Sequence, residues 1–177
     1  SAPSAGCNAK LIGIHDMTTG EGDKEANDGL DLDGHGTHVS STAAGNPMNV
    51  QSGSDIYPIS GVAPRANLVS YKACESESKC RGAWTLAAIN KAVEDRVDVI
   101  NYSIGGGAQP WSESVSLAFL TAHNAGIFVS ASAGNSGPGA STLGHVEPWV
   151  ASVAASTHSR KLGFDFDLTG PAAPPAN

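Results

Sequence analysis

A histidine between two glycines is the residue of this sequence best suited to chemistry. His35 stands in Asp31-Leu-Asp-Gly-His-Gly-Thr-His-Val39, and the run Val39-Ser-Ser-Thr-Ala-Ala44 that follows predicts a helix of small residues. A histidine at a helix start with no bulky neighbour can present its imidazole to an open cleft. That position suits a general base, because such a group must first reach the substrate and must also have a pKa near the working pH.

Two other interpretations of this segment stay open. His35 and His38 are three positions apart and could share a helix face as zinc ligands do, although no third ligand follows in a recognisable pattern. A purely structural histidine is the other alternative. His38 is expected about one helical turn further in, where a side chain points back toward packed neighbours, so His35 is the candidate base and His38 the candidate structural residue.

A second candidate lies in Ile127-Phe-Val-Ser-Ala-Ser-Ala-Gly-Asn-Ser-Gly137, where an apolar run leads into small residues. Asn and Gly are common in turns, so an ordinary turn is one interpretation. The functional interpretation is that Asn135 offers a side-chain amide at the carboxyl end of a parallel strand, where ligand sites of open α/β sheets lie. An amide donor there can stabilise an oxyanion.

A third candidate is Val99-Ile-Asn-Tyr-Ser-Ile-Gly-Gly-Gly107, again an apolar run that ends in glycines. A nucleotide-binding turn is conceivable, but the spacing lacks G-x-G-x-x-G and the chain contains no P-loop. The alternative is an exposed strand edge that pairs with an extended peptide.

The elements that would position these residues alternate along the chain. Short apolar runs predict strands at 11–14, 68–71, 97–100, 127–130 and 149–154. Helical spacing links Leu86, Ile89, Val93 and Val97, and again Val115, Ala118, Phe119 and Ala122, with Gly126 at an expected helix end. This alternation predicts an α/β fold, a doubly wound parallel sheet with helices on both faces. Residues 15–34 are predicted to form a long loop, and the Pro/Ala-rich stretch 162–177 a boundary segment after a domain of residues 1–161.

Composition narrows the function classes. The 177 residues are 40% apolar and 15% charged, and they suffice for one domain with a core. The formal net charge of −7 argues against a nucleic-acid partner, and no apolar run approaches the roughly 20 residues of a membrane span. No signal peptide is visible, so the chain is expected to be either cytosolic or already processed. Of three cysteines, Cys74 and Cys80 bracket a short polar loop that a disulfide could close, and Cys7 is left over.

Together, and in this order, the motifs resemble the subtilisin-like serine proteases. His35-Gly-Thr-His-Val with Ser-Ser-Thr-Ala-Ala-Gly45 is similar to the family's histidine motif, and Gly61-Val-Ala-Pro-Arg-Ala66 to its next signature. Asn101-Tyr-Ser-Ile-Gly-Gly106 resembles the segment that pairs with substrate, and Ala133-Gly-Asn-Ser-Gly137 the oxyanion motif. Cys7-Asn-Ala-Lys-Leu-Ile-Gly13 and Trp149-Val-Ala-Ser-Val-Ala-Ala-Ser-Thr-His158 are similar to the plant cucumisin branch and its bacterial relatives, in which a protease-associated domain is inserted. The Pro/Ala-rich end falls about where that insertion would begin.

The resemblance implies a serine endopeptidase with an Asp-His-Ser triad. His35 would be the base and Asn135 the oxyanion donor, and peptides or proteins would be the substrates. The substrate-binding residues implied are Ser103, Ile104, Gly105, Ser130, Ala131, Ser132 and Ala133. The resemblance also implies secretion, and with it a Cys74–Cys80 disulfide. No cofactor is expected, and calcium is left open.

Two positions depart from the family pattern. The serine motif Gly-Thr-Ser-Met-Ala is absent. Asp16 follows an apolar strand as the family's aspartate does, yet it is close to His35 in sequence, and in the cucumisin-like branch the Cys-Asn-x-Lys-Leu-Ile-Gly stretch comes after the aspartate. The aspartate is therefore expected upstream of Ser1, with Asp16 as the weaker option. The partners expected are the remaining parts of the same protease, and the chain alone is expected to be inactive. The alternative function is a non-catalytic peptide-binding fragment or pseudoprotease.

Overall fold

Seven strands and three helices make up the part of the chain that the computed structural model describes, which is residues 6–18, 29–76, 79–106, 109–157 and 159. In chain order they are β1 Leu11–Asp16, α1 His35–Ala44, β2 Met48–Ser52, β3 Asp55–Ile59, β4 Leu68–Lys72, α2 Gly82–Asp95, β5 Val99–Tyr102, α3 Ser114–Asn124, β6 Phe128–Ser132 and β7 Ala151–Val153.

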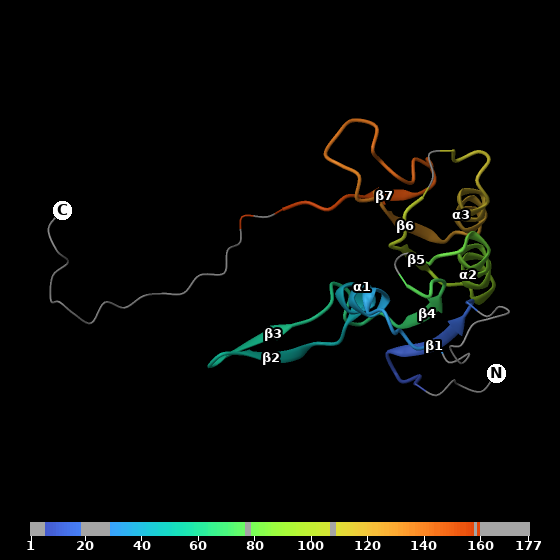
Figure 1. The fold of residues 1–177 in the computed structure, drawn as a ribbon. Coiled ribbons are helices and arrows are strands. Elements are labelled where there is room, and N and C mark those ends of the chain that lie inside the picture. The colour runs from blue at the N-terminus through green and yellow to red at the C-terminus, as the bar shows by residue number, and fades with distance from the viewer. Residues whose placement is uncertain (1–5, 19–28, 77–78, 107–108, 158, 160–177) are drawn as a thin grey trace, which may run out of the picture.

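The five α/β strands are parallel and fall into two hydrogen-bonded groups. β1 pairs with β4, and β5, β6 and β7 form a sheet in that order. Both α1 and α2 contact β4, and Figure 1 shows α1 on one side of the strands with α2 and α3 on the other. The predicted α/β fold with parallel strands and helices on both faces is therefore confirmed.

Local sequence explains where the helices end. At the end of α2, Arg96 adopts a left-handed conformation with φ 57°, and its backbone N–H donates to the carbonyls of Ala92 and Val93. After α3, Gly126 takes φ 86° and Ile127 N–H donates to the carbonyl of Ala122. These contacts satisfy the last carbonyls of each helix and turn the chain back into the next strand.

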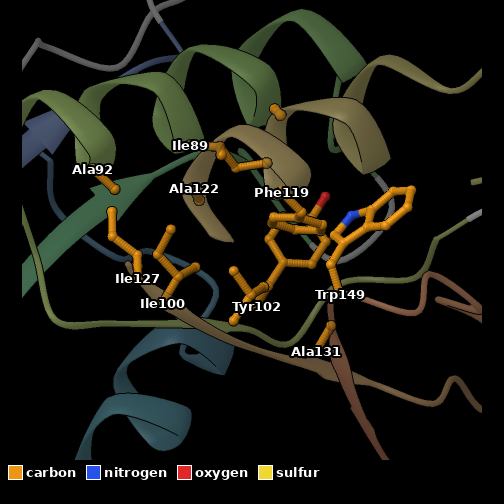
Figure 2. Close-up of a cluster of buried hydrophobic side chains, with 11 residues drawn as sticks. Ile89, Ala92, Ile100, Tyr102, Phe119, Ala122, Ile127, Ala131 and Trp149 are labelled. Atoms are coloured by element: carbon orange, nitrogen blue, oxygen red, sulfur yellow. The ribbon is translucent and has the colours of Figure 1, made fainter. Parts of the chain in front are cut away.

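The core lies between the α2–α3 pair and the β5–β6–β7 sheet (Figure 2). Phe119 of α3 is completely buried, and its ring meets the edge of Tyr102 from β5 with centroids 5.0 Å apart. Trp149 is buried beside them and donates its indole N–H to the carbonyl of Ser116 at 2.9 Å. These buried aromatic side chains pack α2 and α3 against the sheet, so this face of the sheet is shielded from solvent.

Several sequence boundaries need correction. β1 extends to Asp16, so residues 15 and 16 belong to a strand and not to the predicted loop. The antiparallel hairpin β2–β3 was not predicted, and it projects from the rest of the molecule in Figure 1. Its residues are almost all exposed, although Met48-Asn-Val-Gln51 alternates apolar and polar residues as a half-buried strand does. The predicted boundary segment 162–177 lies outside the described residues.

Candidate active site

His35 is the first residue of α1, directly after Gly34 in the left-handed conformation with φ 95°. Its side chain is exposed. Within the described ranges, no hydrogen bond or ion pair engages its imidazole. The prediction of a histidine at a helix start is confirmed, and the ring has the access that a general base requires.

The helix that carries His35 is capped by Asp31. One carboxylate oxygen of Asp31 accepts the backbone N–H of Gly34 at 2.8 Å and that of Asp33 at 3.1 Å. The other accepts the backbone N–H of Thr37 at 2.8 Å and its hydroxyl at 2.6 Å. Partial burial acts to raise the pKa of Asp31, but the hydrogen bonds from Thr37, Gly34 and Asp33 outweigh it and lower this pKa to about 2. The segment therefore fixes the start of α1 and the backbone of His35.

The far end of α1 is closed by the segment that follows the hairpin. Backbone N–H groups of Gly61, Val62 and Ala63 donate to the carbonyls of Gly45, Thr42 and Ala43 at 2.8–3.0 Å. A Cβ on Gly61 would lie 2.7 Å from the Ala44 nitrogen, so only glycine fits there. The Gly61-Val-Ala-Pro motif thus satisfies the last carbonyls of the histidine helix before leading into β4.

His38 and Asp16 are the two other residues considered beside His35, and the structure describes both. His38 is exposed in this chain, and its side chain makes no hydrogen bond to another described residue; that it is packed and hydrogen-bonded in the complete protease stays a prediction. Asp16 lies at the end of β1, where one carboxylate oxygen accepts the backbone N–H of Thr18 at 2.8 Å and its hydroxyl at 2.6 Å. No hydrogen bond or ion pair in the described part of the chain joins Asp16 to His35.

The segment that follows β5 holds Ser103, Ile104 and Gly105. Ser103 and Ile104 are half-buried and Gly105 is exposed. The Asn101 amide donates to the Ser103 hydroxyl at 3.0 Å, and the Ile104 carbonyl faces the Nε2 atom of His145 at 3.0 Å. The segment therefore lies at the carboxyl end of β5, with the Ile104 carbonyl turned inward and Gly105 exposed to solvent.

The segment at the end of β6, residues 130–133, lies beside the 103–105 segment. Ala131 and Ala133 are buried, whereas Ser130 and Ser132 are half-buried on the opposite face of the strand. Ala133 donates to the Val153 carbonyl at 2.8 Å and accepts from Gly144 N–H at 2.9 Å. A Cβ on Gly144 would contact both the Gly106 and the Ala133 carbonyls, at 3.3 and 3.6 Å, so the two segments flank the same residue.

Asn135 follows Gly134, which has φ 85°, and is exposed. Its amide makes no hydrogen bond to another described residue, so its N–H groups can serve a ligand. The structure thus brings the 103–105 segment, the 130–133 segment and Asn135 to one edge of the sheet. It gives no contact between these residues and His35 in the described ranges.

Three residues that support the candidate site were not recognised from the sequence. Asp31 was part of the quoted motif, and an acidic side chain just before a helix start is a signal for a cap. His145 and Glu147 were not singled out, because no spacing rule links them to 104. No group of three or more His, Cys, Asp or Glu side chains suited to a metal occurs among the described residues.

The Cys74 and Cys80 sulfur atoms lie 1.98 Å apart, at bonding distance, in the loop between β4 and α2. Arg81, next in the chain, places its guanidinium 4.7 Å from the centre of the Trp84 ring. No helix in the described part of the chain is both long enough and apolar enough to cross a membrane.

The fold and the candidate residues at the ends of its strands are those of a known protein family. Residues 13–171 match the Subtilase family, and the chain belongs to that family. The resemblance read from the motifs is therefore confirmed.

Individual proteins are also similar to this chain in sequence. The chain is 42% identical to subtilisin-like protease SBT1.7 and 40% identical to subtilisin-like protease SBT1.6, both of Arabidopsis thaliana. These matches cover 93% and 92% of this chain but only 24% and 23% of those proteins. The solved structure of sphericase superposes with a TM-score of 0.60 at 30% identity, covering 80% of this chain and 46% of that one. The chain thus spans about a quarter of the length of the curated relatives it matches.

Proposed function

We propose that the protein containing this chain is a serine endopeptidase that hydrolyses peptide bonds through an Asp-His-Ser triad. The observation that carries the proposal is the exposed His35 at the first position of a capped helix, in a chain of the Subtilase family. The chain contributes the base and the oxyanion donor. Other segments of the same protease supply the remaining groups.

Each residue then has a role. His35 takes the proton from the serine hydroxyl as it attacks the carbonyl and returns it to the leaving amine. The Asn135 amide donates to the oxygen that becomes negative in the tetrahedral intermediate. Ser103, Ile104 and Gly105 pair with the substrate backbone, and residues 130–133 help to wall the pocket for the side chain next to the cleaved bond.

The aspartate belongs to a segment outside this chain. Asp16 is bonded to Thr18 and not to His35. Both β4 and β5 are parallel edge strands, and Tyr71 of β4 packs against the same core cluster as Ile100 of β5. No ladder joins them in the described residues. A further parallel strand between these edges would complete one sheet and bring a side chain at its carboxyl end to the site.

The serine also belongs to another segment. The sequence has no Gly-Thr-Ser-Met-Ala motif. Val99 and Phe128 are paired neighbours on β5 and β6, and they are 57% and 58% exposed on the face opposite α2 and α3. Two large apolar side chains side by side favour a covering element. A serine-bearing segment of the protease would bury this face.

We also propose that the protein is secreted and that Cys74 and Cys80 form a disulfide. The support is the proximity of the two sulfur atoms and the persistence of disulfides in oxidising compartments. Catalysis by the triad requires no cofactor, because the nucleophile, base and oxyanion donors are all protein groups.

The test is covalent labelling of the full-length protease with a biotinylated fluorophosphonate, together with hydrolysis of an unstructured protein. We expect labelling on one serine and loss of hydrolysis in parallel. The His35→Ala variant should show neither. A folded parent that binds peptides without being labelled would identify a pseudoprotease. Activity abolished by a chelator and restored by Zn²⁺ would identify a metal-dependent hydrolase using His35 and His38.

A single substitution decides the role of Asp16. Asp16→Asn in the full-length protease should leave kcat within a factor of about 2, because its carboxylate serves Thr18. Replacing a triad aspartate with asparagine lowers kcat by about 10⁴. A loss of that size, with the thermal midpoint unchanged, would make Asp16 the triad acid.

A further inference from the structure

A buried histidine lies directly behind the substrate-pairing segment. His145 is 1% exposed and sits between the ends of β5 and β6 in the chain's tertiary structure. Its backbone has φ 54°, a left-handed conformation that a residue with a side chain adopts only when its surroundings hold it there.

Both nitrogens of the His145 ring have partners. Nε2 is 3.0 Å from the Ile104 carbonyl oxygen, and Nδ1 is 3.2 Å from a Glu147 carboxylate oxygen. A carbonyl oxygen only accepts hydrogen bonds, so Nε2 must carry the proton in this pair. The Ser116 hydroxyl donates to the same Glu147 oxygen at 2.6 Å, which fixes the carboxylate from the side of α3.

Packing fixes the plane of the ring. The rings of Tyr102 and Phe119 meet it edge-on, with centroids 5.4 and 5.8 Å away. Gly106 lies so close to the ring that even a Cβ there would overlap the imidazole. The ring therefore cannot turn without moving the 104–106 backbone.

We propose that His145 is a positioning residue, which holds the Ile104 carbonyl inward and so presents the Gly105 N–H to the substrate. In a trans peptide the C=O and N–H bonds point in opposite directions. When the Ile104 carbonyl is held against His145, the N–H of the same peptide unit, which belongs to Gly105, points away from the core. Gly105 is exposed, so that N–H is available to a carbonyl of an extended peptide. The inference rests on the proposed function, because it assigns the segment to substrate pairing.

Glu147 and Ser116 act through this ring. Burial acts to raise the pKa of Glu147, but the hydrogen bonds from Ser116 and His145 outweigh it, so the pKa is lowered and the group is a carboxylate. Its second oxygen, Oε2, accepts no hydrogen bond from another described residue. Removing His145 alone would leave this buried charge uncompensated, which destabilises proteins strongly.

The test therefore uses a double variant, His145→Phe with Glu147→Gln, in the full-length protease. The phenylalanine keeps a ring but has no N–H, and the glutamine amide oxygen still accepts from Ser116 without a buried charge. The single Glu147→Gln variant keeps the Nε2 donor and is the conservative comparison. Ser152→Ala is the matched control, because its hydroxyl donates to the carbonyl of Gly144, the residue before His145, and does not reach Ile104.

Two substrates separate positioning from general damage. One is a peptide that extends several residues before the cleaved bond, and the other is p-nitrophenyl acetate, which cannot pair with the segment. For the double variant we expect KM for the peptide to rise about tenfold, the loss of roughly one hydrogen bond, with kcat nearly unchanged. Its kcat/KM for the ester should stay at the parent value. Ser152→Ala should keep the parent KM for the peptide, and Glu147→Gln, which retains the Nε2 donor of His145, should raise it by less than the double variant does.

Three outcomes overturn the inference. They are equal losses on peptide and ester, no change on the peptide, or the same KM rise in the Ser152→Ala control. If the parent hydrolyses neither substrate, the proposed function fails, and the Kd of the extended peptide from titration calorimetry replaces KM with the same expected tenfold change. A parent that binds no extended peptide would then overturn the positioning role as well.

Discussion

Two histidines in this chain have opposite surroundings. His35 is exposed at the first position of α1, and no described side chain hydrogen bonds to it. His145 is 1% exposed, and both of its ring nitrogens are engaged. Under the proposed function, the comparison separates two requirements of a hydrolytic site. The group that exchanges protons needs an open approach, whereas the backbone that receives substrate needs a rigid support behind it.

The supports of the two regions also differ. The backbone of α1 is capped by the Asp31 carboxylate before it and by the Gly61–Ala63 amides after it, so the ring of His35 stays free. The segment at 104 is positioned by a buried side-chain network from His145 to Glu147 and Ser116. Changes near His35 should therefore separate activity from stability more cleanly than changes near His145.

The largest effect is expected from His35→Ala in the full-length protease. Turnover should fall by about 10⁶, the loss known for the triad histidine of a subtilisin, while the thermal midpoint stays near that of the parent. His38→Ala is the matched control at the other histidine of the motif, and it should keep much of the activity. Steady-state kinetics and thermal unfolding of the two variants check this. Loss of turnover in His38→Ala alone would exchange the two assignments.

Asn135→Ala should lower kcat by about 10²–10³ with little change in KM, the size known for an oxyanion asparagine in a subtilisin. The amide is exposed and makes no hydrogen bond within the described residues, so the fold should not depend on it. Ser136→Ala, one position further along, should leave kcat unchanged. A change in KM with an unaltered kcat would place Asn135 in ground-state binding instead.

Gly61→Ala should lower the free energy of unfolding by about 1–3 kcal/mol, because the new Cβ would overlap the backbone at the end of α1. Gly82→Ala is the control, since a Cβ there meets nothing within 4 Å and stands at the start of α2. Denaturant unfolding of both variants measures the difference. Equal stability of the two would show that α1 does not depend on its closure by residues 61–63.

Asp31→Asn should cost about 1 kcal/mol, because the amide NH2 that replaces one carboxylate oxygen of Asp31 cannot accept the Thr37 backbone N–H. Because the pKa of folded Asp31 is lowered to about 2 from 3.8, its contribution is present above pH 4 and is lost as the pH falls toward 2. The difference in thermal midpoint between parent and variant should therefore shrink over that range. Asp33→Asn makes the same charge change without these hydrogen bonds and should show no such trend.

The sequence predicted the site best where a motif and an element coincide. His35 at a helix start, Asn135 after a strand and the strand-ending segment at 103 all follow from local patterns of small residues beside apolar runs. The family resemblance added the roles, and the family match confirmed membership.

Contacts between residues far apart in the sequence could not be predicted from local patterns. The His145 imidazole meets the carbonyl of Ile104, a residue far away in sequence, and no periodicity links the two. Packed neighbours of His38 could not be checked either, because that side of α1 is open in the described residues and the prediction concerns the complete protease. The β2–β3 hairpin was missed because its apolar alternation is confined to Met48-Asn-Val-Gln51 and Pro58 stands within the second strand, which argues against a strand.

Histidine footprinting of the active full-length protease with diethyl pyrocarbonate tests the contrast between the two histidines most directly. Peptide mapping by mass spectrometry would follow each site while activity is sampled. We predict that His35 is modified rapidly, that the loss of activity follows modification of His35, and that prior fluorophosphonate labelling protects His35. His145 should react only after denaturation. Modification of native His145 as fast as His35, or full activity after complete modification of His35, would contradict the account.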